Sequence, residues 1–431
     1  MSKNNFLKII NYLINYGILI FVFLLPWQVR WIYQEATLNS EIWEYGRFSL
    51  YGTEILLIIL LSFFAIKIIL EKKDVETLKP NLIFNFSFWI VILIIYSALT
   101  LLWSDNTYLS LYSLLRLLEG IALFYLIINC LDYKFKRKLP YVIIISALIQ
   151  SLIALGQWFY QYSIGNKWLG MSLLNSAEAG IGVIETTLGR FLRAYGSLAH
   201  PNILAGFLVI AILITVILIN REQAKKTIFL LFSSLIVLLL GLILTFSRAG
   251  VITLFSCLII YIIYFRFKKY DLKMILFSTL TVILVFSFFT IFYSDLVLTR
   301  LNSNTRLEVL SNTERLESYN QALLIVQDNW HRGIGFGQYT LVLAQLYPDL
   351  PGYMYQPVHD SGMLILAELG VWGLLFFIII ILFILRNSNH FWLLIIVLLI
   401  LGIFDHYLRS MYFGIMLWWL VMALGYNKKP S

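Results

Sequence analysis

The sequence predicts an all-α polytopic membrane protein, with residues 1–431 forming a single integral membrane domain. Apolar residues make up 60% of the chain and the mean hydropathy is +0.84, whereas charged residues make up 13%. A soluble domain carries about 25% charged residues. Apolar runs of about 20 residues recur along the whole chain, as bilayer-spanning helices require. These runs are continuous and do not alternate with polar residues, which disfavours a transmembrane β-barrel.

The apolar runs correspond to about 12 membrane spans. The first follows Lys3 and Lys8 in the manner of a signal peptide, but it ends without a small-residue cleavage site, so we interpret it as a span. The predicted spans are residues 6–25, 54–70, 83–102, 110–131, 141–160, 203–219, 228–246, 250–265, 274–293, 361–385, 391–404 and 411–425. An even number of spans leaves both termini on the same side of the membrane.

Charge is distributed unevenly among the loops. Lysines dominate one set, for example Lys134, Lys225 and Lys268. Basic residues accumulate on the cytoplasmic side of membrane proteins, so we expect these loops and both termini in the cytoplasm. The protein is then predicted to lie in the cytoplasmic (inner) membrane, with the opposite set of loops on the periplasmic or extracellular side. This topology accounts for the net charge of +9, which is therefore no indication of nucleic-acid binding.

The opposite set of loops carries arginine in place of lysine. Apart from Lys167, its basic residues are Arg30, Arg47, Arg116, Arg190, Arg193, Arg248, Arg300, Arg306, Arg315, Arg332 and Arg409. Arginine is preferred at sites that bind a phosphate or carboxylate, because its planar guanidinium group donates two parallel hydrogen bonds to such a group. We interpret the bias as a sign of anion binding. The alternatives are structural bridges to outer carboxylates and, for Arg248, snorkelling at a helix end.

Two outer loops are long enough to carry function. Residues 161–202 are rich in glycine, contain Arg193, and end in a turn in which His200 precedes a proline. Residues 294–360 form the largest predicted loop, between spans 9 and 10, and we expect this helical loop to carry the active site. A third loop, residues 26–53, is aromatic, which is typical of anchoring at the bilayer interface.

The second half of the largest loop has two features. Apolar residues at three- and four-residue spacing predict a helix from Asn312 to Asn329. Asn312 or Thr313 is the expected N-cap, which places Arg315 in the first turn. A Gly-x-Gly-x-Gly cluster begins at Gly333 and is a weak indication of phosphate binding. No strand precedes it, so a nucleotide-binding motif is excluded.

His359 lies where this loop meets the next span. Imidazole readily accepts a proton near neutral pH, which makes His359 a candidate base, although a structural role is the alternative for a histidine at an interface. The histidines and acids show no zinc-like spacing, and both cysteines fall inside predicted spans. We therefore expect no metal ion and no other cofactor.

These residues resemble the O-antigen ligase/polymerase superfamily in identity, order and spacing over residues 190–385. The resemblance is carried by Ser247-Arg248-Ala249-Gly250 at a helix junction, Glu314-Arg315, Gly333-x-Gly-x-Gly, and His359 followed by Leu366-Ala367-Glu368-Leu369-Gly370-Val371-Trp372-Gly373. A 12-span topology with a large late loop is similar too. As a set these motifs are fairly specific to the superfamily, but they separate its members poorly.

The resemblance implies a metal-independent, inverting membrane glycosyltransferase. Its donor would be a glycan on undecaprenyl pyrophosphate, and its acceptor a hydroxyl group of a glycan, lipid or protein at the lipid bilayer. In the family, the histidine activates the acceptor and arginines hold the pyrophosphate; the matching residues here are His359, Arg248 and Arg315. Further candidates for substrate binding are Arg193, Arg306, His200 and Asp360. Family members often have asparagine after the histidine, so Asp360 either tunes His359 or caps the next helix.

Several functions are open at this point. Ligase, polymerase and protein O-glycosylating enzymes share the motifs. A flippase or other transporter of lipid-linked glycans belongs to a different class, and it should carry ionisable or helix-breaking residues near the bilayer midplane. The predicted spans are nearly free of charge, and the main exceptions, Arg116, Glu119 and Glu368, lie nearer the outer half. Polar residues gather in the outer loops, which favours the enzyme.

Overall fold

The computed structural model describes residues 3–71, 86–178, 180–187, 189–302 and 305–427. Nine helices of these ranges are long and apolar enough to cross a membrane. They are α1 (Lys3–Leu24), α2 (Gly52–Glu71), α4 (Thr107–Cys130), α6 (Leu139–Tyr160, after the short α5, Tyr133–Lys136), α7 (Pro201–Ile219), α8 (Lys225–Leu244), α9 (Arg248–Phe267), α10 (Lys273–Phe292) and α14 (Ser361–Arg386). The prediction of a helical multi-pass membrane protein is confirmed.

Three shorter apolar helices coincide with the remaining predicted spans. They are α3 (Phe86–Leu99, continued by a 3-10 turn to Leu102), α15 (Trp392–Phe404) and α17 (Tyr412–Gly425). Residues 83–85 of the predicted third span lie outside the described residues. Each predicted apolar run thus corresponds to a helix, and the side of the membrane on which each end lies stays a prediction.

Helix α7 is the centre of the bundle. It packs against α6, α8 and α9, and all of its residues except Leu218 are buried. A helix that is apolar on every side is expected in such a position. Because α7 is buried, its N-terminal end, with His200 and Asn202, is held inside the protein.

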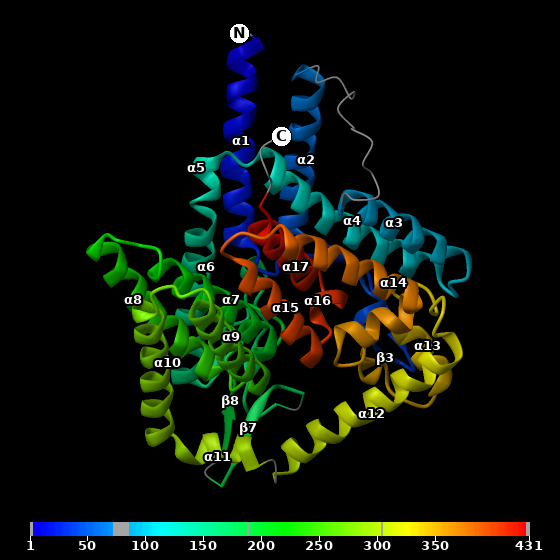
Figure 1. Ribbon diagram of the computed structural model, residues 1–431. Coiled ribbons are helices and arrows are strands. Elements are labelled where there is room, and N and C mark those ends of the chain that lie inside the picture. The colour runs from blue at the N-terminus through cyan, green and yellow to red at the C-terminus, as the bar shows by residue number, and fades with distance from the viewer. Residues whose placement is uncertain (1–2, 72–85, 179, 188, 303–304, 428–431) are drawn as a thin grey trace.

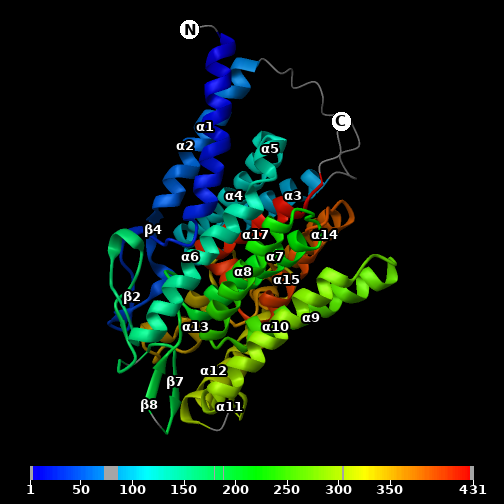
Figure 2. The same cartoon turned by 90° about the vertical axis from the view of Figure 1, so that its left-hand side faces the viewer.

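The largest loop is helical, as predicted. It contains α11 (Ser294–Asn302), α12 (Arg306–Asn329) and α13 (Tyr339–Leu346). In Figures 1 and 2, α11, α12 and the hairpin of β7 (Val183–Thr186) and β8 (Gly189–Leu192) lie at the end of the bundle away from the N-terminus. We call this end the loop face.

The predicted start of α12 was wrong. The helix begins at Arg306 instead of Asn312, its N-cap is Thr305 without a side-chain capping bond, and Arg315 lies in the third turn. The missed first turn contains Glu308, which is buried and pairs with arginines of other elements. Tertiary contacts, which a periodicity argument does not see, therefore extend the helix.

The loops that were predicted to lie outside also contain short antiparallel hairpins, which the all-α prediction missed. In the described residues the pairs are β1 (Arg30–Gln34) with β4 (Phe48–Tyr51), β2 (Thr37–Leu38) with β3 (Glu41–Ile42), β5 (Tyr162–Ser163) with β6 (Leu174–Asn175), and β7 (Val183–Thr186) with β8 (Gly189–Leu192). Strands this short are set by local turns and contacts with the bundle, so they leave little periodicity in the sequence.

The glycine cluster of the large loop supports a break in α14. Gly370 has φ +64°, and the helix is interrupted there. The backbone N–H groups of Ile334 and Gly335 donate to the carbonyls of Ala367 and Glu368, each at 3.0 Å. These bonds satisfy helix carbonyls next to the break. The cluster therefore holds α14 against the loop, and no phosphate is needed to explain its glycines.

Candidate active site

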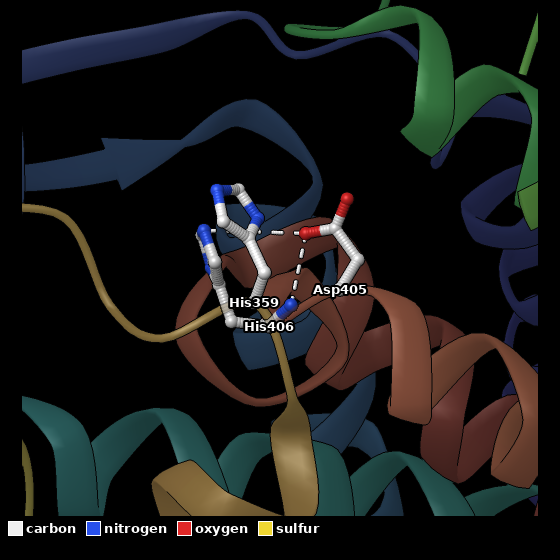
Figure 3. A group of neighbouring side chains, drawn as sticks. All are labelled: His359, Asp405 and His406. Carbon is white, nitrogen blue, oxygen red and sulfur yellow. Dashed lines mark hydrogen bonds and ion pairs between the residues drawn. The ribbon is translucent and has the colours of Figure 1, made fainter. Parts of the chain in front are cut away.

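The candidate site begins at the corner where the large loop meets α14. The Ser361 hydroxyl donates to the backbone carbonyl of Asp405 at 2.7 Å, which ties this corner to the turn between α15 and α16 (Tyr407–Ser410). His359, Asp405 and His406 consequently lie together, with side-chain atoms within 4.8 Å of one another (Figure 3). The rings of the two histidines are 5.4 Å apart.

Asp405 is the negative charge of this group. Its Oδ1 accepts from the backbone N–H of His406 at 2.8 Å, and its Oδ2 accepts from Asn202 Nδ2 at 3.3 Å. Burial by itself would raise the pKa of Asp405, but His406, His359 and His200, when they are protonated in acid, and the bond from Asn202 hold it below its ordinary value. Asp405 is therefore a carboxylate at neutral pH.

The three histidines around Asp405 are neutral near pH 7. Burial lowers the pKa of His406 to about 4 and that of His200 to about 3. Burial also lowers the pKa of His359, and the positive charge of Arg315 adds to this effect, while Asp405 opposes it. A neutral imidazole can accept a proton, so His359 is in the form that a base requires.

Hydrogen bonds distinguish His359 from its two neighbours. His406 Nδ1 lies 2.7 Å from the Ser410 hydroxyl, and His200 Nδ1 accepts from the backbone N–H of Asn202 at 3.1 Å. His359 Nδ1 is buried and has no hydrogen-bond partner among the residues that the structure describes. Among these three histidines of the described chain, His359 is thus the one whose Nδ1 makes no hydrogen bond.

A buried arginine adjoins the histidines. Arg193, which follows β8, donates from Nε to the Thr245 carbonyl at 2.8 Å and from Nη2 to Asn202 Oδ1 at 2.9 Å. Asn202 thereby links Arg193 to Asp405. Burial lowers the pKa of Arg193 to about 9, and repulsion from Arg300 contributes. Its hydrogen-bond partners are a carbonyl and an amide, neither of which neutralises the guanidinium.

Two further arginines meet at the start of α12. Glu308 pairs with Arg300, and its Oε2 lies 3.4 Å from Arg248 Nη2. Arg248 also donates to Asn312 Oδ1 at 3.0 Å, and Arg300 donates to the Phe246 carbonyl at 3.1–3.2 Å. Arg248 and Arg300 therefore lie side by side, with one carboxylate between them.

Arg315 connects the arginines to the histidines. Its charge lowers the pKa of His359, His200, Arg193 and Arg300, so it lies within interaction range of all four. One turn later, on the same face of α12, the Tyr319 hydroxyl donates to the backbone carbonyls of His359 (3.3 Å) and Ile403 (3.2 Å). These bonds hold that face of α12 against the His359 corner.

The structure thus brings His359, Arg315, Arg193 and His200 into one group, with Arg248 joined to it through Glu308 and Arg300. The other two predicted residues are placed differently. Arg306 Nη2 lies 3.8 Å from Glu185, and its side chain is 74% exposed, so it faces solvent beside the β7–β8 hairpin.

Asp360 caps a helix. Its Oδ1 accepts from the backbone N–H of Met363 at 2.7 Å at the start of α14. Of the two roles predicted for Asp360, the structure supports capping. The carboxylate that acts on His359 is Asp405, from a different part of the chain.

Comparison with known protein families identifies part of the chain. Residues 233–378 match the model of the O-antigen ligase family. The match confirms the resemblance to the O-antigen ligase superfamily. No curated protein matches the chain. The match supports a membrane enzyme of ligase or polymerase type in polysaccharide and lipopolysaccharide biosynthesis.

The O-antigen ligase segment contributes only part of the site. Arg248, Arg300, Arg315 and His359 lie inside it, and Asp405 lies outside it. Asn202, Arg193, His200 and His406 also come from outside. The sequence analysis did not predict Asp405 or His406 as site residues, because no spacing rule links them to His359.

Several arginines of the loops predicted to lie outside form ion pairs within the protein. The structural pairs are Arg30 with Glu44, Arg47 with Glu35 and Glu44, Arg116 with Glu54 and Glu119, and Arg409 with Glu368. For these residues the structure supports the alternative of structural bridges. Arg248 and Arg300 share the single carboxylate of Glu308, and Arg193 donates to a carbonyl and an amide, so together with Arg315 they carry a surplus of positive charge that suits an anion.

An apolar cavity opens beside the His359 corner. It has a volume of about 280 Å³, and it is lined mainly by side chains of α14, α15 and α17, with Asp360 and Ser361 among the lining residues. Ile378, Ile381 and Trp418 are among them. A cavity of this composition accepts hydrocarbon.

Proposed function

We propose that the protein transfers a glycan from undecaprenyl pyrophosphate to an acceptor hydroxyl at the outer face of the cytoplasmic membrane, with inversion at the transferred sugar carbon. The observation that carries this proposal is the meeting of four arginines with a neutral histidine at the edge of a helical membrane bundle. The O-antigen ligase match supports the same class of chemistry.

The arginines are suited to the leaving group. Arg193, Arg248, Arg300 and Arg315 contribute four positive charges, and the carboxylates among them are Glu308 and Asp405. The surplus of positive charge attracts a diphosphate, and guanidinium forks bind its oxygens in pairs. Positive groups fixed in a partly dry site stabilise charge that develops on the departing pyrophosphate. No metal ion is required for this role.

His359 is placed to act as the base. It takes the proton of the acceptor hydroxyl, and the acceptor oxygen forms a bond to the sugar carbon. The bond from that carbon to the pyrophosphate oxygen breaks, and its electron pair leaves with undecaprenyl pyrophosphate. Asp405 stabilises the imidazolium that results, because opposite charges attract strongly when they are partly buried. General base catalysis of this kind contributes about 10²–10⁴-fold.

The apolar cavity is suited to the prenyl chain of the donor. It starts at Asp360 and Ser361, next to the base, and continues between apolar helices. A chain bound there leaves its pyrophosphate near the arginines and its tail in a lipid-like environment. The two reactants are thus held together, which by itself favours transfer.

The test uses purified protein with undecaprenyl-pyrophosphate-linked glycan and a panel of glycan, lipid and peptide acceptors. The wild type is expected to form transferred product. The His359→Ala variant is expected to lose more than about 100-fold in rate. His331→Ala is the matched control, since His331 is exposed on the same loop. Full transfer by His359→Ala overturns the assignment of the base.

The same preparation in liposomes distinguishes the transporter alternative. A flippase moves fluorescent prenyl-pyrophosphate glycan between leaflets without an acceptor, and it forms no new glycosidic bond. Translocation without transfer would replace the proposed enzyme with that function.

A further inference from the structure

A second cavity lies against His359, on the side of α12 that does not face the arginines. It has a volume of about 180 Å³, which leaves room for a single sugar ring. One wall is the segment from Leu350 to His359, and the other is α12. The polar residues that line it are Glu314, Glu317, Ser318, Gln321, Tyr353 and Gln356.

Helix geometry explains why this wall differs from the arginine side. Four of the lining residues occupy one face of α12, because Glu317 and Ser318 lie three and four residues after Glu314, and Gln321 lies three and four residues after them. Successive residues of an α-helix are rotated by about 100°, so Arg315 belongs to the neighbouring face. The helix therefore presents acidic and amide groups to this cavity and a cation to the histidine group.

The lining has the chemistry of a site for an uncharged sugar. Carboxylate and amide oxygens accept hydrogen bonds from sugar hydroxyls, amide N–H groups donate to them, and an aromatic ring covers the apolar face of the sugar. Among the described residues that line the cavity, none is a lysine or arginine. Burial raises the pKa of Glu314, and the neighbouring carboxylate of Glu317 raises it further. Two crowded carboxylates repel a phosphate and favour a hydroxyl-rich ligand.

We propose that this cavity is the acceptor subsite, and that it binds an uncharged sugar residue whose hydroxyl points at His359. The inference rests on the proposed function. It places the acceptor and the anionic leaving group in separate subsites, so that the acceptor oxygen can reach the sugar carbon from the face opposite the departing pyrophosphate, as inversion requires. It also restricts the acceptor end to a neutral sugar, in contrast to a phosphorylated one.

The kinetic test compares variants of the cavity with a matched control. The probe acceptors are a fluorescent neutral oligosaccharide and its phosphorylated counterpart. Glu317→Gln and Gln321→Ala are each expected to raise the KM for the neutral acceptor about tenfold, as the loss of a hydrogen bond to the sugar implies, with kcat and the KM for the donor within about twofold. Asn320→Ala, on the exposed side of the same helix, is expected to leave kcat and both KM values unchanged.

A labelling test measures sugar binding without catalysis. Ser318→Cys places a thiol in the cavity wall and Asn320→Cys places one outside it, while the native Cys130 and Cys257 are buried. The neutral oligosaccharide is expected to slow maleimide labelling of Ser318→Cys at least about threefold and to leave Asn320→Cys unchanged. The phosphorylated oligosaccharide is expected to protect neither.

The two tests separate the inference from the function on which it rests. If the wild type transfers glycan but neither KM nor labelling responds to the cavity, the subsite is overturned and the transferase stands. If the sugar protects Ser318→Cys but no transfer occurs, the sugar site stands and the proposed reaction is overturned. If the wild type transfers no glycan and the sugar does not protect Ser318→Cys, both the proposed reaction and the sugar subsite are overturned.

Discussion

Replacing Asp405 with asparagine tests how the base is supported. Asp405 and His359 present side-chain atoms within 4.8 Å of each other. At that separation a carboxylate and an imidazolium attract by roughly 3 kcal/mol if the effective dielectric constant is about 20. The attraction arises only when His359 carries a proton, which is during and after proton transfer. Asp405→Asn should therefore lower kcat by roughly 100-fold.

The pH dependence of kcat gives the decisive measurement. Activity rises with pH as His359 loses its proton. Asp405 raises the pKa of His359 against the effect of burial, so its replacement should shift the acidic limb to lower pH while the plateau falls. Asp349→Asn, which removes a carboxylate from an exposed position of the same loop, should alter neither.

Two results would refute this reasoning. An unchanged plateau in Asp405→Asn would show that the carboxylate does not stabilise the imidazolium. A lower plateau with an unmoved acidic limb would assign Asp405 a purely structural role through Asn202 and His406, and the melting temperature of the variant would then be expected to fall as well.

Three further predictions concern the arginines, the metal question and the fold. Arg248→Lys and Arg315→Lys should each lower kcat more than about tenfold, because a lysine ammonium group cannot form the paired hydrogen bonds of a guanidinium group. Arg190→Lys, the control, should have nearly wild-type kcat. Full activity in both site variants would show that a positive charge alone is sufficient. EDTA should leave transfer unchanged, and a loss restored by Zn²⁺ would instead assign an ion to the histidine–aspartate group. Gly370→Ala should lower the melting temperature of the purified protein, since a side chain at φ +64° costs about 1–3 kcal/mol and a Cβ there would lie 2.5 Å from the His331 carbonyl oxygen. Gly156→Ala is its control, because a Cβ at Gly156 meets no atom within 4 Å, and equal melting temperatures would count against a strained break.

The apolar helices were predictable because membrane insertion imposes length and composition on each helix independently. Each apolar run could be recognised from its own residues, without knowledge of its neighbours. The start of α12 was not predictable in this way. Glu308 belongs to the helix because Arg248 and Arg300 hold it from two other elements.

The site was predictable only where it is local in sequence. His359 was recognisable because it adjoins a span, and Arg248 because it opens one. Asp405 was missed because it comes from the corner between α15 and α16, far from His359 in the sequence. It is nevertheless the charged residue with the largest effect on the pKa of His359. The available signal was an aspartate in a short turn between two apolar runs. Burying an unpaired charge is costly, so such a residue is expected to have a polar partner in the fold.

Helix α12 connects these conclusions. Its Arg315 face joins the arginines, its Tyr319 hydroxyl is fixed to the backbone at His359, and its Glu317 face lines the second cavity. A helix outside the membrane can carry opposite charges on adjacent faces, because water screens the cost that a bilayer would impose. A single rigid element thereby sets the distance between a site suited to an anion and one suited to a neutral sugar, with the base between them. Asn320→Pro should disturb both sites at once and raise the KM for the donor and the KM for the acceptor together. Asn320→Ala should leave both KM values unchanged.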